Sequence, residues 1–275
     1  MKARPTDVRH DIFSVLVERL HCIRCYVGVE TDADQGLQTL QRWANAAANR
    51  KAIEVTRALG LFVCFNVLMF DPDTTLESIE TNVRFIEWAN DCPFNFGKVQ
   101  LYAGTPILKR MQDEGRARGD WLRWSYALTD PGAERFYRLQ HTLFEARNFG
   151  DRALANDIQA LRFDLEVTRK FHPELLPPDW HALGTALSAR LARGATIALL
   201  RLLSHVREGD PATDPELLAE LGPVLRREEH EVRAAMEVLA LRLQARVGRG
   251  TPLTIIGDRV ATALQSGEPA AGVRA

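Results

Sequence analysis

The sequence predicts an α/β fold in which a short parallel sheet is followed by a mainly helical region. Three short apolar stretches, residues 23–30, 61–70 and 96–102, have the composition of buried strands. Segments with the apolar spacing of helices separate them, as the crossover connections between parallel neighbours require. Beyond residue 115 the character shifts to long helical segments. This pattern alone does not distinguish an open sheet from a barrel.

The first elements follow in a regular alternation. Residues 11–20 place apolar side chains at helical spacing and predict a short amphipathic helix. Residues 23–30 are compact and β-branched, which favours a buried strand. Residues 37–59 are helical in character, with a break expected among the small and polar residues 45–49 and an end at Gly60.

The most hydrophobic stretch of the chain is residues 61–70, which we expect to form a central parallel strand. Thr74 or Thr75 can cap the helix that follows, because a side-chain oxygen can accept a hydrogen bond from the first turn. A third and shorter strand is expected over residues 96–102, followed by a helix over residues 107–114. The order of elements is therefore that of a parallel sheet covered by helices.

Long helices are expected in the remainder of the chain. Residues 134–149 and 153–171 predict one helix each, and residues 180–247 are rich in Ala, Leu and Arg in the manner of a small bundle. Prolines between these regions indicate a boundary near residue 178. The predicted divisions are an α/β region at 1–122, a helical extension at 123–178, a bundle-like helical region at 179–265 and a flexible tail at 266–275.

Composition indicates a soluble globular protein. The 35 basic and 36 acidic residues nearly balance, so there is no broad electrostatic reason to expect nucleic acid or an anionic membrane as partner. No apolar run is long enough to span a membrane, and residues 1–11 are too polar for a secretory signal, which makes the cytoplasm the expected location. Four cysteines in 275 residues do not form a disulfide framework, so reduced thiols are expected.

Three segments at the predicted strand ends carry a resemblance to a known family. They read YVGVET at 26–31, NVLMFDPDTTLE at 66–77 and LYAGTP at 101–106. In this order they are similar to the fourth, fifth and sixth barrel strands of radical S-adenosylmethionine enzymes, in the cobalamin-associated branch. The similarity covers about residues 7–122 and weakens toward residue 171. The resemblance implies half of a TIM-like parallel β/α barrel, with about three strands, before the helical region.

The resemblance also implies a cofactor-binding face. In a parallel barrel, polar residues at the carboxyl ends of strands are the ones that reach a ligand. Glu30, Asp71, Tyr102 and Thr105 hold such positions, and Gly28 shares the face of Glu30 by strand alternation. These five residues are the expected contacts to S-adenosylmethionine. For Glu30 the alternative is a role at the start of the next helix through the helix dipole.

The cluster-binding motif of that family is absent from the sequence. Family members hold a [4Fe–4S] cluster with a C-x3-C-x2-C motif, whereas the cysteines here are Cys22, Cys25, Cys64 and Cys92. Cys22 and Cys25 are the nearest imitation, with ordinary buried thiols as the alternative to a metal role. We expect no catalytic residue and no metal ligand in this chain. We also expect the first three strands and the cobalamin-binding domain of the family to be missing.

A half barrel has an exposed edge. The first predicted strand, residues 23–30, is expected to leave a long apolar edge unpaired, which soluble proteins normally cover. We therefore expect a partner polypeptide or a second copy of the chain to cover it, or else the chain to be a truncated remnant of marginal stability.

Other patterns leave two interpretations each. Three carboxylates between residues 71 and 77 can bind a divalent cation or orient a substrate, or they can cap a helix. Arg162, Glu166 and Arg169 are spaced for ion pairs on a solvated helix face. A group of aromatic residues is expected either to line a substrate pocket or to pack in the core: Trp121, Trp124, Tyr126, Phe136 and Tyr137.

Two functions of different class follow from the sequence. In the first, the chain keeps part of the S-adenosylmethionine and substrate face of a radical enzyme. Catalysis, such as methyl transfer, then requires another chain to supply the cluster half. In the second, it is a noncatalytic helical binding or assembly protein that uses the half barrel as a scaffold. Fold alone does not choose between them.

Overall fold

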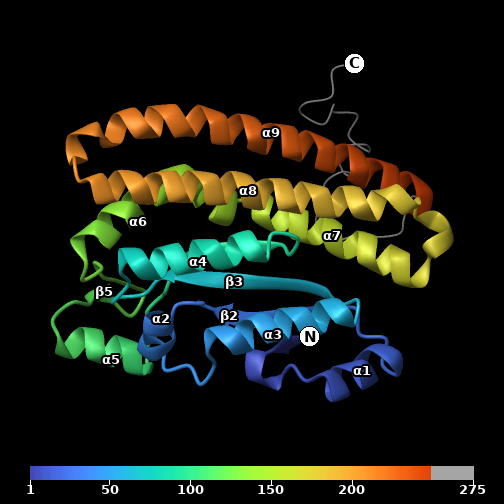
Figure 1. Ribbon diagram of the computed structural model, residues 1–275, viewed down its shortest axis with the longest axis horizontal. Helices are drawn as coiled ribbons and strands as arrows, with labels where there is room; N and C mark the ends of the chain where they lie inside the picture. Colours follow the sequence, from blue (N-terminus) through green and yellow to red (C-terminus); the bar gives the residue numbers. More distant parts are fainter. Residues whose placement is uncertain (249–275) are drawn as a thin grey trace.

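A computed structural model describes residues 1–248 and places a four-stranded parallel sheet at the centre of the α/β region (Figure 1). Its strands are β1 (Lys2–Ala3), β2 (Arg24–Glu30), β3 (Phe62–Phe70) and β4 (Phe94–Lys98), hydrogen-bonded in chain order. Sequential parallel order with helical crossovers is the arrangement of a partial β/α barrel. The predicted α/β fold with a partial barrel and a mainly helical second part is confirmed.

The crossover segments form helices close to the predicted places. A 3-10 turn (Pro5–Asp7) precedes them, and they comprise α1 (His10–Glu18), α2 (Asp34–Thr39), α3 (Ala46–Ala58), α4 (Leu76–Trp88) and α5 (Pro106–Asp113). The predicted break between α2 and α3 is present, because Asn45 caps α3 by accepting from Ala48 N at 2.9 Å. Thr75 caps α4 in a reciprocal capping box with Ser78.

The third predicted strand is displaced in the structure. β4 ends at Lys98, so Tyr102 lies four residues beyond it, in the turn that leads to α5. Phe94 and Phe96 provide the strand's alternation, and both are buried on the same face as Phe65 of β3. The alternation of buried and solvent-exposed side chains does not continue beyond β4, because Gln100, which would share the buried face of Phe94 and Phe96, is exposed. The prediction of strand structure as far as Tyr102 is therefore wrong.

The two faces of the sheet differ in burial. Val27, Phe65 and Val67 point to one face and are completely buried under α3 and α4, where Phe65 meets Phe85 with ring centroids 5.2 Å apart. On the opposite face, which we call the open face, several residues keep contact with solvent: Tyr26, Gly28, Asn66, Leu68, Asn95 and Gly97. Asn66 is exposed in the middle of the central strand. This is the face that would line the inside of a barrel.

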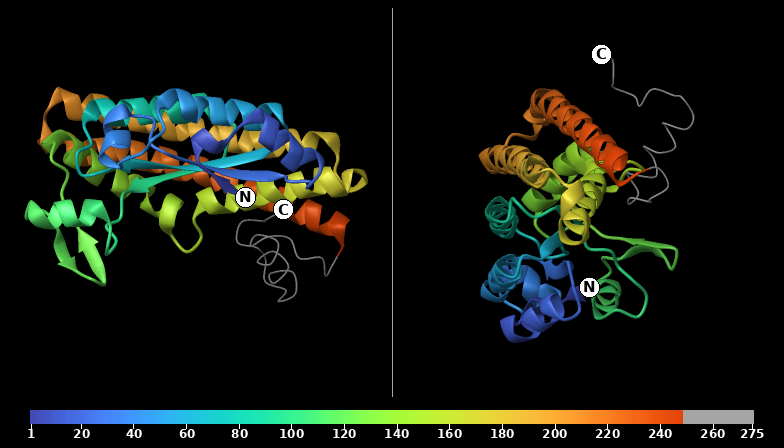
Figure 2. Two further views of the ribbon diagram at one scale, coloured as in Figure 1. Left: turned by 90° about the horizontal axis from the view of Figure 1, so that it is seen from below. Right: turned by 90° about the vertical axis from the view of Figure 1, so that its right-hand side faces the viewer.

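Four long helices form a layer against the α/β region (Figures 1 and 2). They are α6 (Pro131–Phe149), α7 (Leu154–Phe171), α8 (Pro178–Glu208) and α9 (Asp214–Val247). Short 3-10 turns at Pro173–Leu175 and Pro211–Thr213 connect the last three. A two-stranded hairpin, β5 (Arg118–Asp120) and β6 (Arg123–Ser125), precedes them and stands apart from the main sheet.

The helical layer and the sheet share one hydrophobic core. Phe65 of β3, Phe85 of α4, Phe136 of α6 and Leu199 of α8 belong to one continuous cluster of buried side chains. A second cluster joins α7, α8 and α9 around Leu165. The predicted division near residue 178 therefore falls between elements that pack together. The predicted tail at 266–275 lies outside the described residues.

The first predicted strand is not a free edge. β1 pairs with the first half of β2, with Lys2 opposite Tyr26, and the amino group of Met1 donates to the Arg24 carbonyl at 2.9 Å. The expectation of a long unpaired edge is wrong for this half, because Lys2 and Ala3 are extended and lie alongside β2. Cover by a partner chain or a second copy stays a prediction.

The charged residues of α7 are also placed differently from the expectation. Arg162 and Glu166 are each only 6% exposed, because α7 lies between the sheet and α8. Arg162 donates to the Asp91 carbonyl and to Ser188, and Glu166 accepts from Arg169 and His181. The prediction of a solvated face is therefore wrong for these side chains.

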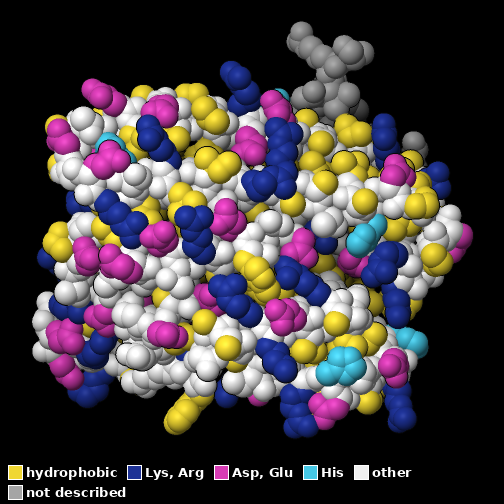
Figure 3. Space-filling model, in the orientation of Figure 1, with side chains coloured by type: hydrophobic (Ala, Val, Ile, Leu, Met, Phe, Trp, Pro, Cys, Tyr) yellow, Lys and Arg dark blue, Asp and Glu magenta, His cyan; other side chains and the backbone are white. Residues whose placement is uncertain are grey.

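The surface is mixed in charge. Figure 3 shows basic and acidic side chains beside one another over the drawn face, without a field of one sign. None of the helices in residues 1–248 combines the length and apolar character that crossing a bilayer requires.

Candidate functional site

Glu30 ends β2 in an unusual backbone conformation. Its φ of +62° is rare for a residue with a side chain, and the β2–β3 register shifts just before it. The carboxylate accepts a hydrogen bond from Arg42 at 2.6 Å and lies over Gly28, whose missing Cβ would be 3.4 Å from it. The space above Gly28 is therefore taken by Glu30 itself. Arg42 engages this carboxylate at the carboxyl end of β2.

Asp71 is buried in the turn after β3. It is 2% exposed, and its carboxylate accepts from Asp73 N at 2.9 Å and Gln35 Nε2 at 3.3 Å, while burial raises its pKa. Asp73 is bound by Arg110 at 2.7 Å and Arg116 at 3.4 Å. These carboxylates thus hold the loop together. Among residues 1–248 no set of three or more acidic, histidine or cysteine side chains gathers as a metal site.

The two remaining predicted contacts lie at the start of α5. Thr105 caps α5 by accepting from Leu108 N at 3.4 Å. The Tyr102 side chain is 62% exposed and its hydroxyl contacts Gln100 at 2.6 Å. The structure therefore brings Gly28 and Glu30 together, and it joins Tyr102 and Thr105, because the Thr105 hydroxyl donates to the Tyr102 carbonyl at 2.7 Å. Asp71 is held by a different set of partners.

The cysteines do not fit an iron–sulfur cluster. Cys25, Cys64 and Cys92 are buried, and burial raises their pKa values to about 11, 12 and 12, which disfavours the thiolates that bind iron. Cys22 is half-buried and approaches the Arg24 carbonyl at 3.6 Å. In the described part of the chain, then, no group of thiols is assembled for a cluster.

A large cavity lies along β4, and we call it the β4 cavity. Its volume is about 830 Å³. Its walls are β4 with the segment that follows it, the β5–β6 hairpin and α6. Asn66 and Gly97 of the open face also line it, so the cavity continues onto the sheet. A cavity of this size suits a small organic molecule.

Lys98 is the last residue of β4 and lines this cavity. Its ammonium donates to the Tyr126 carbonyl at 2.7 Å and lies 4.3 Å and 4.2 Å from the ring centroids of Tyr126 and Tyr137. Burial lowers its pKa, and only the field of Glu134 opposes this. Within residues 1–248 no carboxylate lies within ion-pair distance of it. A cation in such surroundings is a candidate ligand-binding group.

Further polar groups surround the same cavity. Trp124 Nε1 is buried and has no hydrogen-bond partner among the described residues, which is uncommon for an indole N–H. His141 lines the cavity on α6, stacks on Tyr137 and contacts Glu145 at 3.3 Å. Trp121 is 78% exposed at the rim. The sequence left two alternatives for the aromatic residues, a pocket wall or core packing, and the structure contains both. Trp124 and Tyr137 line the cavity, whereas Phe136 is fully buried in the core.

Lys98 was missed from the sequence for an identifiable reason. The expected strand ended at Tyr102, so Lys98 fell inside it instead of at its carboxyl end. A signal was present, because lysine is depleted in strands and Lys98 stands beside the apolar Val99.

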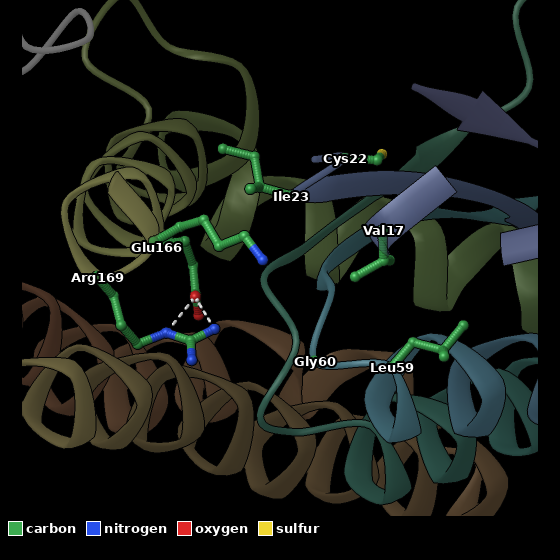
Figure 4. Close-up of a pocket in the computed structure, with 8 residues that line it drawn as sticks. Val17, Cys22, Ile23, Leu59, Gly60, Glu166 and Arg169 are labelled. Atoms are coloured by element: carbon green, nitrogen blue, oxygen red, sulfur yellow. Dashed lines mark hydrogen bonds and ion pairs between the residues drawn. The ribbon is translucent and has the colours of Figure 1, made fainter. Parts of the chain in front are cut away.

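A smaller cavity lies at the opposite ends of the strands (Figure 4). Its volume is about 150 Å³, and Ile23 and Gly60, which precede β2 and β3, line it. Figure 4 shows Glu166 of α7 bound to Arg169 at its wall, with Cys22 on the far side. The Glu166 carboxylate is therefore already paired with Arg169 of α7 and His181 of α8. The amino ends of barrel strands generally serve stability, and this cavity is small, so the β4 cavity is the better candidate.

Comparison with known proteins gives weak likenesses only. No family model matches the sequence, and no curated protein does. Two solved structures of the cobalamin-dependent S-adenosylmethionine radical enzyme OxsB are similar in fold. One, with aqua-cobalamin and S-adenosylmethionine bound, has 14% identity and a TM-score of 0.48, and the apo form has 13% and 0.46. The matched regions span 96% and 97% of this chain but only 45% and 42% of the two OxsB chains, so this chain has less than half of their length. Likeness at this level assigns neither family nor activity.

Proposed function

We propose that this chain binds a planar organic molecule in the β4 cavity. The observation that carries the proposal is an 830 Å³ cavity at the carboxyl end of a parallel strand, walled by aromatic rings around Lys98. Ligand sites in parallel sheets are found at this end of the strands. Aromatic walls with a few polar groups are typical of small-molecule sites.

The polar groups of the cavity favour a ligand with an acceptor atom. Trp124 Nε1 is an unpartnered donor in the described structure, and Lys98 has donor capacity beyond its bond to Tyr126. A buried donor without a partner costs about 1–3 kcal/mol, so a ligand that accepts from Trp124 recovers this free energy. The indole ring of Trp121, which is 78% exposed and lines the same cavity, offers a flat apolar surface.

The test is a titration with 2-naphthalenemethanol, followed through the indole N–H resonances of the ¹⁵N-labelled protein. Trp121 and Trp124 line the cavity and are expected to shift, while Trp180 on α8 is not. A fragment that gains about 0.3 kcal/mol per non-hydrogen atom binds with a Kd on the order of 1 mM. Uniform shifts of all indoles, or none at saturating fragment, contradict the proposal.

Matched variants locate the binding. Ala103→Phe fills space inside the cavity, whereas Ala127→Phe makes the same change at an exposed position that does not line it. We expect the first to weaken binding at least about tenfold, the effect of roughly 1.4 kcal/mol, and the second to leave it unchanged. Equal effects would place the binding elsewhere.

A second candidate is S-adenosylmethionine on the β2 end of the open face, with catalysis only when a partner chain supplies the cluster half. It is supported by the strand-end sequences and by the position of Glu30 above Gly28. Arg42 forms an ion pair with the Glu30 carboxylate, so a ligand hydroxyl must either share this carboxylate with Arg42 or displace the Arg42 side chain. Calorimetric titration with S-adenosylmethionine is expected to show tighter binding in Arg42→Gln and weaker binding in Glu30→Gln. Equal affinities in both variants refute this candidate and leave the proposal for the β4 cavity unaffected.

A further inference from the structure

The lysines of this chain are not equivalent. The sequence contains Lys2, Lys51, Lys98, Lys109 and Lys170, and the structure describes all five. Lys98 alone among them is half-buried, while the other four are exposed. Lys109 is in addition paired with Asp113 at 2.9 Å. Lys98 therefore has a chemical environment that the rest of the chain does not reproduce.

Lys98 can keep its hydrogen bond as a neutral amine, while its contacts with the rings of Tyr126 and Tyr137 favour the ammonium. One N–H is used by the Tyr126 carbonyl at 2.7 Å, and a neutral amine can keep this bond while its lone pair stays available. No acceptor with a full negative charge lies within ion-pair distance among residues 1–248, so loss of the proton breaks no ion pair. Burial, which lowers the pKa of Lys98, acts in the same direction.

We infer that Lys98 is a nucleophile that forms an imine with a carbonyl-bearing ligand in the β4 cavity. This inference rests on the proposed binding function and names its ligand class: planar aldehydes or ketones. A lysine amine desolvated in an apolar pocket is the usual form of such a nucleophile.

The step is balanced within the cavity. The Lys98 nitrogen bonds to the carbonyl carbon, and the carbonyl oxygen becomes the hydroxyl of a carbinolamine after proton transfer from nitrogen. Loss of that hydroxyl with the second N–H proton releases one water and leaves the C=N bond. His141 lines the same cavity one helical turn beyond Tyr137, and its imidazole can deliver a proton to the departing hydroxyl. No oxidant, reductant or metal takes part.

The test is reductive trapping with 2-naphthaldehyde, the aldehyde that matches the alcohol used for binding. The protein is incubated with the aldehyde, reduced with sodium borohydride and mapped by peptide mass spectrometry. We expect one dominant naphthylmethyl adduct, at Lys98, forming about tenfold or more faster than the adduct at Lys109, because binding and desolvation both favour it. Excess 2-naphthalenemethanol is expected to protect Lys98 and not Lys109.

Variants and outcomes separate this inference from the binding proposal. Lys98→Arg removes the amine and is expected to lose the adduct, whereas Lys109→Arg is expected to keep the Lys98 adduct. If the alcohol binds but trapping at Lys98 is no faster than at Lys109, the imine inference is wrong and the binding function stands. If the alcohol does not bind and labelling is even over all lysines, both are wrong.

Discussion

Replacing Leu199 with alanine tests whether the helical layer and the sheet fold as one unit. Leu199 of α8 is fully buried in the same core cluster as Phe65 of β3. Leu→Ala removes about three methylene equivalents at about 0.8 kcal/mol each, and the cavity left behind adds to this loss. We expect the free energy of unfolding to fall by about 3–4 kcal/mol.

The control is Leu183→Ala, the same substitution at a position on α8 that is 41% exposed. It is expected to cost about 0.5 kcal/mol or less. Urea unfolding measured by circular dichroism gives both values, and native-state hydrogen exchange at Val63 and Val67 reports on β3. We expect Leu199→Ala to reduce the protection of these β3 amides by the same free energy. Unchanged protection in β3, together with loss of helix signal, would refute a shared core.

Three further predictions concern local features of the fold. Thr75→Ala removes the cap of α4 and is expected to cost about 1 kcal/mol in chemical denaturation, with retention of wild-type stability as the contrary result. Asp214 binds Arg135 at 2.5 Å, and this hydrogen bond holds its pKa below the ordinary value. Asp214→Asn should therefore cost about 2 kcal/mol at pH 7, and this difference should shrink as the pH falls below about 4 and through the lowered pKa. A difference that does not depend on pH contradicts this. Gly184→Ala places a Cβ 2.5 Å from Leu165, so we expect a loss of about 1–2 kcal/mol despite better helix propensity, and a stabilised variant in thermal melts refutes that packing.

The order of elements could be predicted because it depends on local patterns. The apolar stretch that became β3 and the hydroxyl cap at Thr75 are both local signals, and both are present in the structure. The end of β4 could not be found in this way, because it depends on pairing with β3 and not on residues 99–102. The extended residues that form β1 are likewise too few to give a pattern.

The candidate site was less predictable than the fold. Gly28 and Glu30 do lie together, but the occupation of Glu30 by Arg42 depends on the fold of the intervening loop. Arg162 reads as a surface residue by its spacing, yet packing between α8 and the sheet buries it. Lys98 of β4 is surrounded by Tyr126, which follows β6, and by Tyr137 of α6. These residues are separated in the chain, so only the assembled structure shows that they meet.

Nuclear Overhauser contacts between 2-naphthalenemethanol and the protein test the binding of a planar molecule in the β4 cavity most directly. We predict contacts from the naphthyl protons to the rings of Trp124, Tyr126 and Tyr137, which line the cavity. Contacts confined to Trp43, which is 96% exposed and lies outside the cavity, would contradict the account.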